Sequence, residues 1–380
     1  MKRTIVSLIS EHTTPNFLFI KEMREPGNRL LFISPKRFEA RIDWIIKALG
    51  YTNCMINSII MPDGVEEKWD KIIKTIKRRL SKDEQYIVNL TCGNKYLITA
   101  IPKVFEGYDA EFYFIPTSKN VILKLGDESR REINYRISVS EYFDCNNTVI
   151  SSHKELTEKE DYTQPFFHIF LNRIDMFAEM TEKLRYYRNK NIGDILLVEK
   201  EGIPKVNENS RHYPPVKGLL NFLRELDFPI QLYGKLSKQE SFYLTGGWFE
   251  EYVYTKIREK IAPQDLMLGV ILPFSDNKNS NKRDLDIVFT YENKLFIIEC
   301  KVSNVDEKPY NEMVYKAASL RSERLSRLLA HTYIFSLFEE DERFVDVARA
   351  MNISFYDKSF FIDEEKFGLI IADIIKKANG

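Results

Sequence analysis

The sequence predicts an α/β protein with a Rossmann-like N-terminal domain, a mixed connector and a second α/β domain at the C-terminus. Strand-like apolar runs alternate with helical patterns over the first 125 residues, which indicates an open parallel sheet. A polar, turn-rich region follows, and two apolar runs near residue 290 indicate a second sheet. For 380 residues, two domains plus a connector are the natural count, and we place their limits at 1–140, 141–235 and 236–380.

In the N-terminal domain, strands and helices are expected to alternate along the chain. The expected strands are 4–9, 30–33, 54–60 and 86–90, and the expected helices are 15–23, 36–49, 65–80 and 95–104. Pro15 suits a first helical turn, and Gly50 suits the end of a helix. Residues 112–115 and 121–125 predict a closing hairpin.

Polar residues follow three of these strands, at the edge where open α/β sheets bind ligands. They are Ser10, Glu11, His12, Thr13, Thr14, Asn16, Ser34, Pro35, Lys36, Asn89, Thr91, Cys92, Gly93, Asn94 and Lys95. Gly93 permits a tight turn, after which the amides at a helix start and Lys95 would face an anion. There is no Gly-x-Gly-x-x-Gly motif, which disfavours a dinucleotide cofactor. The alternative is that these are ordinary turn and cap residues. We favour it less because three such loops meet at one edge of the sheet.

A β-hairpin is the clearest element of the second domain. Two apolar runs between residues 284 and 301 flank a polar break. A two-residue loop of Glu292 and Asn293 sets the register. Asp286 then lies directly across from Glu299.

Side-chain alternation predicts one charged and one apolar face for this hairpin. The charged face would carry Asp286, Glu299 and Lys301, and the apolar face Leu285, Ile287, Phe296, Ile298 and Cys300. Opposed carboxylates repel, and a divalent cation, Mg²⁺ or Mn²⁺, removes that penalty by binding their oxygens. Lys301 would then hold or deprotonate a water beside the metal. The alternative, an exposed strand end with a salt bridge, is less favoured because an Asp faces the motif.

A helix before the hairpin supplies a third acid. Phe249, Val253 and Ile257 recur at helical spacing and mark a buried stripe. Glu250 lies at the edge of that stripe, whereas Glu251 is expected to face solvent. We therefore assign Glu250 to the metal site. The alternative is that both are solvated glutamates paired with nearby basic residues.

The combination resembles the signature of the PD-(D/E)XK nuclease superfamily, a helix Glu, a strand Asp and a Glu-x-Lys on the next strand. The matching residues are Glu250, Asp286, Glu299 and Lys301, with Leu285 where a Pro often precedes the Asp. The resemblance spans roughly residues 240–340. It implies a restriction-endonuclease-like fold and metal-dependent cutting of nucleic acid.

The polar run 89–95 resembles the signature of CARF domains, the sensors of cyclic oligoadenylates in type III CRISPR immunity. Residues 92–94 read Cys-Gly-Asn where that family usually has Gly-Gly-Thr. A CARF domain followed by a PD-(D/E)XK domain is similar to the cyclic-oligoadenylate-activated CRISPR ancillary nucleases. That resemblance implies a homodimer that binds cyclic tetra-adenylate across its two-fold axis and cuts DNA or RNA in antiviral defence.

A basic helical pattern after the Glu-x-Lys motif is a candidate nucleic-acid contact. Arg321 and Arg324 recur on one side of the expected helix 319–329, and Lys316 lies one turn earlier. Phosphate binding is the functional interpretation, and a solvated helix face is the alternative. Arg324 and His331 also match the loose spacing of HEPN ribonucleases, but the predicted hairpin argues against that all-helical fold.

Composition limits the remaining possibilities. Lys plus Arg and Asp plus Glu are 56 each, so the net charge of zero favours a local groove or a triggered activity over a constitutive nucleic-acid binder. Four scattered cysteines predict a reducing compartment without structural zinc. We see no leader and no membrane-spanning segment, so we expect a cytoplasmic protein with no membrane partner. The competing function is a ligand-sensing regulator that binds nucleic acid without cutting it.

Overall fold

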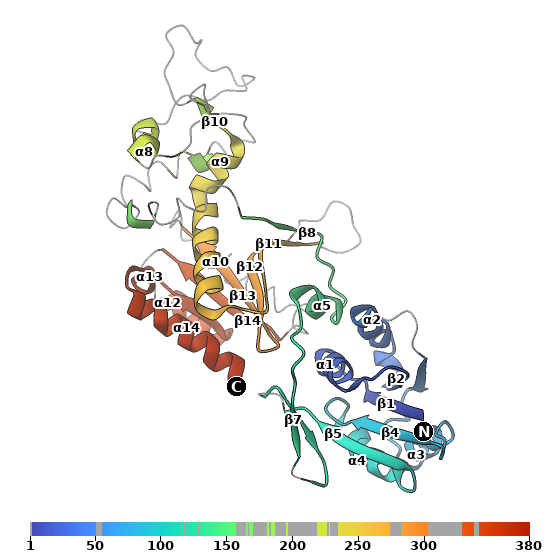
Figure 1. Cartoon of the computed structure of the whole chain (residues 1–380). Helices are drawn as coiled ribbons and strands as arrows, with labels where there is room; N and C mark the ends of the chain where they lie inside the picture. The colour runs from blue at the N-terminus through green and yellow to red at the C-terminus, as the bar shows by residue number, and fades with distance from the viewer. Residues whose placement is uncertain are drawn as a thin grey trace.

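The computed structural model describes residues 2–50, 55–116, 119–127, 129–156, 235–273, 283–302, 329–337 and 342–380, together with short stretches between residues 165 and 228. Within these residues the chain forms a seven-stranded sheet followed by a six-stranded sheet, each with helices packed against it (Figure 1). The predicted α/β class is confirmed. A further strand pair joins β9 (Ile195–Leu196) and β10 (Lys235–Leu236).

The first sheet has the strand order β3-β2-β1-β4-β5-β6-β7. Its strands are β1 (Lys2–Leu8), β2 (Arg29–Pro35), β3 (Ile56–Met61), β4 (Glu84–Asn89), β5 (Asp109–Phe114), β6 (Val121–Lys124) and β7 (Arg130–Glu132). Neighbours from β3 to β5 are parallel, whereas β5, β6 and β7 pair antiparallel. The predicted Rossmann-like sheet and its closing hairpin are therefore confirmed.

Helices cover both faces of this sheet, as a parallel sheet requires. They are α1 (Thr14–Met23), α2 (Ala40–Leu49), α3 (Trp69–Lys77) and α4 (Lys95–Phe105), with a 3₁₀ turn, Lys36–Phe38, before α2. Phe17 and Ile45 place α1 and α2 in one core, and Ile76 and Ile101 place α3 and α4 in the other. Gly50 ends α2 in the left-handed conformation (φ 65°).

One predicted helix, 65–80, is shorter than expected, because α3 begins only at Trp69. Gly64 (φ 71°) belongs to a turn, and Lys68 is extended, so neither continues a helix. The predicted helix 36–49 likewise starts with the 3₁₀ turn rather than with α-helical residues.

The second sheet is mixed, with the order β15-β14-β13-β12-β11-β8. Its strands are β8 (Ser152–Lys154), β11 (Asp265–Leu272), β12 (Arg283–Tyr291), β13 (Lys294–Lys301), β14 (His331–Ser336) and β15 (Ile353–Tyr356). The strands from β8 to β13 pair antiparallel, and β13, β14 and β15 pair parallel. The strand β8 comes from the region between the two domains, so the chain enters the second sheet before it reaches the helix with Glu250.

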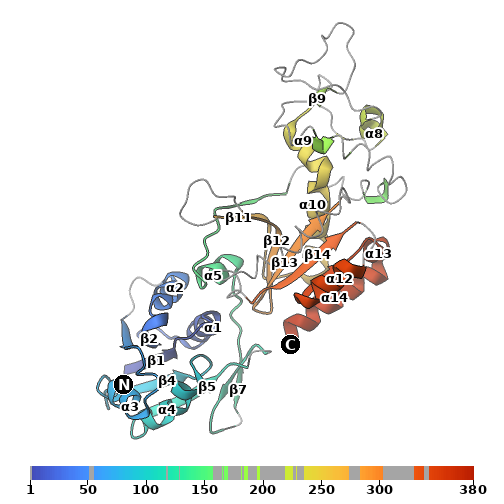
Figure 2. The ribbon, with the colours of Figure 1, turned by 180° about the vertical axis from the view of Figure 1, so that it is seen from behind.

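Helices α10 (Trp248–Ile261) and α14 (Glu364–Asn379) cover one face of the second sheet, whereas α12 (Glu342–Ala350) packs on the opposite face over β14 and β15. The rest of that opposite face is turned towards the first domain (Figure 2). The other helices of the second domain are α9 (Lys238–Phe242) and α13 (Ser359–Ile362), with a π-helical turn, Tyr243–Gly247, leading into α10. From the connector, α8 (Leu219–Glu225) is also described. Helices α10 and α14 pack on this sheet through side chains such as Val253 and Ile370.

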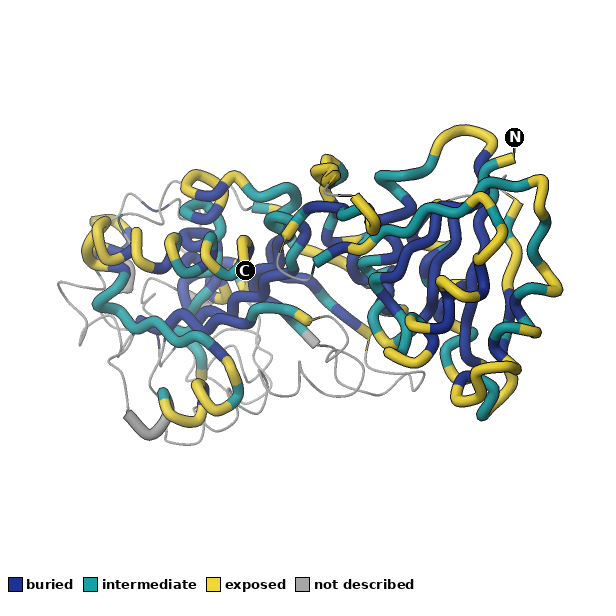
Figure 3. Tube along the Cα trace, turned by 90° about the horizontal axis from the view of Figure 1, so that it is seen from below, coloured by how far each residue is buried: buried dark blue, intermediate teal, exposed yellow. Residues whose placement is uncertain are grey.

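The two domains share one hydrophobic core. Leu285, Val288 and Ile297 of the second sheet belong to the same buried cluster as Phe17 of α1 and Phe143 of α5 (Val139–Asp144). Figure 3 shows buried segments running through both sheets. Each buried aliphatic side chain contributes about 1.5–3 kcal/mol, against about 0.5–1.5 kcal/mol for a typical hydrogen bond. Apolar packing therefore holds the domains together, and polar contacts between them set their alignment.

Candidate functional site

The predicted hairpin is present with the predicted register. Strands β12 and β13 pair from Tyr291–Lys294 to Ile287–Ile298. Glu292 and Asn293 form the turn with positive φ angles of 47° and 60°. Those angles fit the two-residue turn that matches the twist of a hairpin. The register therefore brings the strand ends with Asp286 and Glu299 to the same end of the hairpin.

Beyond the last ladder pair, the hairpin opens around an acidic side chain. The amide of Cys300 donates a 2.7 Å hydrogen bond to Asp286 Oδ2 instead of extending the ladder. Asp286 is 7% exposed and Glu299 is 1% exposed, so both carboxyl groups are buried. Lys301 follows, with Nζ 3.7 Å from Glu299 Oε2 and a side chain about one-third exposed.

The predicted apolar face of the hairpin is wrong at one position. Ile287 and Ile298 pack towards α10, as expected, but Leu285 packs on the opposite face, in the core shared with the first domain. The side-chain alternation is interrupted beside Asp286, where Gly269 of β11 adopts a left-handed backbone (φ 56°). The neighbouring strand β11 changes its buried face at this same glycine.

Helix α10 delivers Glu250 to the acidic end of the hairpin. Its predicted buried stripe is confirmed, because Phe249, Val253 and Ile257 are 0% exposed. The prediction that Glu251 faces solvent is wrong, since Glu251 is 3% exposed. The cause is a second layer over α10, because connector residues share a buried cluster with Trp248 on that side. Those connector residues are Phe167, Leu184 and Leu223.

Lys154, which the sequence interpretation did not include, reaches the acidic site. It lies at the end of β8, and its Nζ donates a 3.1 Å hydrogen bond to Glu250 Oε2. Burial works to lower the pKa of Lys154, but the charges of Glu250, Asp284 and Asp286 outweigh it and raise the pKa. No sequence signal marks this residue, because it is a single lysine in a polar stretch.

The site carries more negative charge than its lysines balance. Burial and the nearby charge of Asp286 raise the pKa of Glu250 to about 7, against the lowering effect of Lys154. Burial, together with Asp286 and Glu250, also raises the pKa of the Cys300 thiol. Carboxylates that repel one another in a buried site are suited to bind a cation.

The donor chemistry fits Mg²⁺ or Mn²⁺. Asp286, Glu299 and Glu250 offer only carboxylate oxygens, which hard cations prefer. Within the described residues, no group of three or more acidic, histidine or cysteine side chains is placed to hold a metal ion. Mg²⁺ commonly takes one or two carboxylates and completes its shell with water and substrate phosphate. An open, acidic site of this kind therefore suits it.

A pH prediction follows from the raised pKa of Glu250. Between about pH 4.5 and 7 the folded protein keeps a proton that the unfolded chain releases, so the unfolding free energy falls as pH rises through that window. Glu250→Gln removes this component, which is worth roughly 1–3 kcal/mol. Urea unfolding in EDTA at several pH values should show a smaller loss of stability in Glu250→Gln than in the wild type. Parallel pH profiles would contradict the assignment.

At the carboxyl edge of the first sheet, some predicted ligand residues form a buried polar network. Asn16 Nδ2 donates to the Leu8 carbonyl (2.9 Å), and Asn89 Nδ2 donates to Asn16 Oδ1 (2.9 Å). The Thr91 hydroxyl donates to Asn89 Oδ1 (2.6 Å) and accepts a hydrogen bond from the amide of Ile115 (2.8 Å). Asn16 and Asn89 are 0% exposed, so in this structure they hold the loops in place.

Other predicted edge residues are also buried, and the rest lie at the surface. Thr13, Ser34, Pro35 and Cys92 are buried, and the Thr13 hydroxyl donates to the Cys145 carbonyl (2.5 Å). The residues at least partly open to solvent are Ser10, Glu11, His12, Thr14, Lys36, Thr91, Gly93, Asn94 and Lys95. An exposed surface with one lysine on each of two loops is thus available for an anionic ligand.

The turn before α4 is built as predicted. Gly93 has φ 119°, and an added Cβ would lie 3.3 Å from Ile98 and 3.4 Å from Leu8. Asn94 caps the helix, because its side chain accepts a hydrogen bond from the amide of Leu97 (2.7 Å). Lys95 begins α4 and is exposed.

A pocket beside this edge was not predicted. It has a volume of about 480 Å³ and extends from the end of β4 to the β6–β7 turn. Its lining residues are Leu90, Ile98, Phe114, Leu123, Lys124, Leu125, Gly126, Asp127 and Ser129. Phe114 is 38% exposed, so an aromatic side chain is accessible there. Sequence reasoning missed the pocket because most of these residues lie in the hairpin after the motif.

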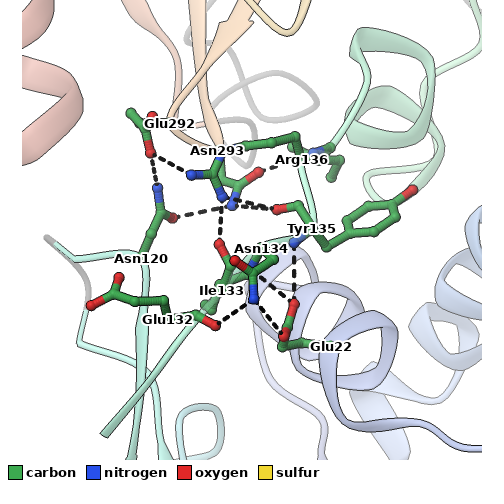
Figure 4. Close-up of polar contacts among 10 residues, drawn as sticks. Glu22, Asn120, Glu132, Ile133, Asn134, Tyr135, Arg136, Glu292 and Asn293 are labelled. Carbon is green, nitrogen blue, oxygen red and sulfur yellow. Dashed lines mark hydrogen bonds and ion pairs between the residues drawn. The ribbon is translucent and has the colours of Figure 1, made fainter.

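The turn of the hairpin between β12 and β13 docks on the first domain (Figure 4). Asn293 Oδ1 accepts a hydrogen bond from the amide of Ile137 (2.9 Å). Asn293 Nδ2 donates to Asn120 Oδ1 (3.1 Å) and to the Tyr135 carbonyl (3.0 Å). Asn293 is 5% exposed, so this contact is sealed from solvent.

Neighbouring residues extend the contact. Glu292 Oε2 accepts a 2.7 Å hydrogen bond from Asn120 and lies 3.3 Å from the Arg136 guanidinium. The Thr290 hydroxyl donates to the Ile137 carbonyl (2.8 Å). The turn therefore reaches two segments of the first domain, the one after β5 and the one after β7.

One set of predicted residues falls in a part of the chain that the structure does not describe. The candidate nucleic-acid residues Lys316, Arg321 and Arg324 lie outside the described residues. Among the helices that the structure describes, none is long and apolar enough to cross a membrane. Within the same residues, Cys92, Cys145 and Cys300 are buried free thiols.

Two family models match the chain. The model of the Card1 CARF domain matches residues 4–142, and the model of the Card1-like endonuclease domain matches residues 237–359. Together these segments span more than half of the chain. A comparison with curated proteins gave no significant match.

Two solved structures share the fold along the whole chain. Protein VC1899 from Vibrio cholerae is 18% identical, with 100% of this chain and 99% of that chain covered and a TM-score of 0.78. Can2 from Sulfobacillus thermosulfidooxidans, in complex with cyclic tetra-adenylate, is 18% identical, with 100% of both chains covered and a TM-score of 0.73. At this identity, the similarity shows the fold alone.

Proposed function

Because this chain belongs to the family of CRISPR ancillary proteins that join a CARF domain to a Card1-like endonuclease domain, we propose that it is a metal-dependent nuclease switched on by cyclic tetra-adenylate. It acts as a cytoplasmic homodimer in type III CRISPR defence and cuts DNA, RNA or both. The domain limits 1–140, 141–235 and 236–380 are part of this proposal. The choice of activator is supported by the complex of Can2 with cyclic tetra-adenylate.

The observation that carries the proposal is the convergence of Glu250 with the acidic end of the hairpin. Asp286 and Glu299 would hold Mg²⁺ or Mn²⁺, and Glu250 would complete the site. When bound, such an ion activates water and stabilises charge on the phosphate. Lys301 ends β13 with its ammonium 3.7 Å from Glu299, where it can hold the attacking water and accept or return its proton.

The docked hairpin turn supports control by the sensor domain. The ligand loop after β4 reaches the segment after β5 through the hydrogen bond between Thr91 and Ile115, and that segment carries Asn120. The loop after β1 leads into α1, whose Glu22 accepts hydrogen bonds from the amides of Asn134 (3.0 Å) and Tyr135 (3.1 Å). Both routes end at the turn that aligns the catalytic hairpin (Figure 4). An activator that favours one edge conformation would thereby favour one hairpin alignment.

The test is a cutting assay with the full-length protein. Supercoiled plasmid, single-stranded DNA and single-stranded RNA are incubated with Mn²⁺, with and without cyclic tetra-adenylate, and with EDTA as a control. We expect cutting of at least one substrate that requires both Mn²⁺ and the activator. Binding of nucleic acid without cutting under all conditions would instead favour the regulator.

A further inference from the structure

Lys154 occupies the place where positive charge is needed in the acidic site. Its ammonium lies 3.1 Å from Glu250 Oε2, and the Glu250 side chain is 13% exposed. Nearby, Asp284 Oδ1 is buried and accepts no hydrogen bond from the residues that the structure describes. Lys154 is therefore positioned as a counter-ion for carboxylates that the proposed function assigns to a metal ion.

Strand β11 has a glycine, Gly269, at the point where the Lys154 side chain crosses it. An added Cβ at Gly269 would lie within 2.7 Å of Lys154 Cγ, Cδ and Cε. The aliphatic chain thus crosses β11 directly over a glycine. The ring of Phe242 lies 5.0 Å from Lys154 Nζ and stabilises the ammonium from another side. Three elements, β8, β11 and α9, therefore cooperate to place one charge.

Lys154 also belongs to the segment that leaves the sensor domain. Strand β8 follows α5, which packs in the core shared by the two domains. The pairing of β8 with β11 shifts register between Leu268 and Ile271. Lys154 pairs with Leu268 at one side of this shift, so the strand that carries it connects the shared core to the acidic site.

We propose that Lys154 is a positioning residue that sets the metal affinity of the nuclease site, by neutralising Glu250 in the metal-free protein and competing with the divalent ion for it. This inference rests on the proposed nuclease function. It assigns to the connector strand a role in controlling when the site accepts a metal.

The experiment measures Mn²⁺ binding by calorimetry in the full-length protein. Lys154→Met keeps the aliphatic chain over Gly269 and removes the charge, so we expect Mn²⁺ to bind about 10-fold more tightly than in the wild type. Lys154→Gln, which retains a hydrogen-bond donor, should also bind Mn²⁺ more tightly than the wild type. Lys154→Arg should bind Mn²⁺ like the wild type. The matched control is Lys256→Met, because Lys256 lies on α10 and pairs with Glu364 (2.6 Å) on α14 instead.

Thermal unfolding gives a second readout that does not involve activity. In EDTA, Lys154→Met should unfold at a lower temperature than the wild type, because Glu250 has lost its partner. Saturating Mn²⁺ should remove or reverse that difference. If the wild type binds Mn²⁺ and both neutral variants bind it equally well or more weakly, the proposed role of Lys154 is wrong, and the metal site itself still stands. If neither the wild type nor any variant binds Mn²⁺, the proposed metal site is wrong, and so is this inference.

Discussion

We expect Glu299→Gln to abolish activated cutting and to leave binding of cyclic tetra-adenylate unchanged. Glu299 is 1% exposed at the end of β13, so its carboxylate acts within the buried site. The amide keeps the size of the side chain and removes the charge that would hold the metal. Loss of outer partners of metal ligands already costs 10–100-fold, so loss of a ligand should cost at least about 100-fold in cutting rate.

The measurement pairs cutting rates with Mn²⁺-dependent thermal shifts. The wild type should be stabilised by Mn²⁺, and Glu299→Gln should not, because only a bound ion shifts the unfolding equilibrium. Lys301→Met should retain the thermal shift and cut about 100- to 10,000-fold more slowly, the usual cost of losing a proton-transferring group. Glu259→Gln, on the exposed side of α10, is the matched control. Cutting at wild-type rates by both site variants would exclude this catalytic assignment.

We expect Asn293→Gly to remove most of the stimulation by cyclic tetra-adenylate. Asn293 makes hydrogen bonds to Ile137, Asn120 and Tyr135, and all three are lost in the variant. The turn itself should persist, because glycine accepts the φ of 60° found at this position. Typical coupling free energies correspond to factors of 5–150, so we expect stimulation to fall by about that factor.

The readout is the ratio of cutting rates with and without the activator. A separate binding measurement tests the same coupling: we expect saturating Mn²⁺ to tighten activator binding in the wild type, and Asn293→Gly to reduce that effect, because coupling between two binding sites is reciprocal. Asn352→Gly is the matched control, because Asn352 is exposed and also has a positive φ (54°) in the turn before β15. Full stimulation in Asn293→Gly would show that the turn does not transmit the activator signal.

The sequence predicted the elements whose geometry depends on near neighbours. The register of the hairpin follows from its two-residue turn, and Gly93 and Asn94 form the predicted start of α4 because φ preference and capping are local properties. The alternation of strands and helices along the chain likewise predicted the parallel sheet, because only a few sheet topologies are compatible with such alternation.

The burial of Glu251, the reversed face of Leu285 and the arrival of Lys154 were not predictable in this way. Each depends on a segment that is distant in sequence or on a local break in a strand. Connector residues cover α10, the alternation breaks beside Gly269, and β8 pairs with β11. Neither periodicity nor motif spacing reports such contacts.

The sequence by itself determined two α/β sheets, a hairpin with acids at its open end and a polar sheet edge, because hydrophobic period, turn type and strand order depend on residues that are near in sequence. Only the tertiary structure decided that Lys154 shares the acidic site and that Asn293 ties the hairpin to the first domain. The physical reason is that charge pairing and buried hydrogen bonding depend on distances in space. Those distances are set by the packing of the whole chain.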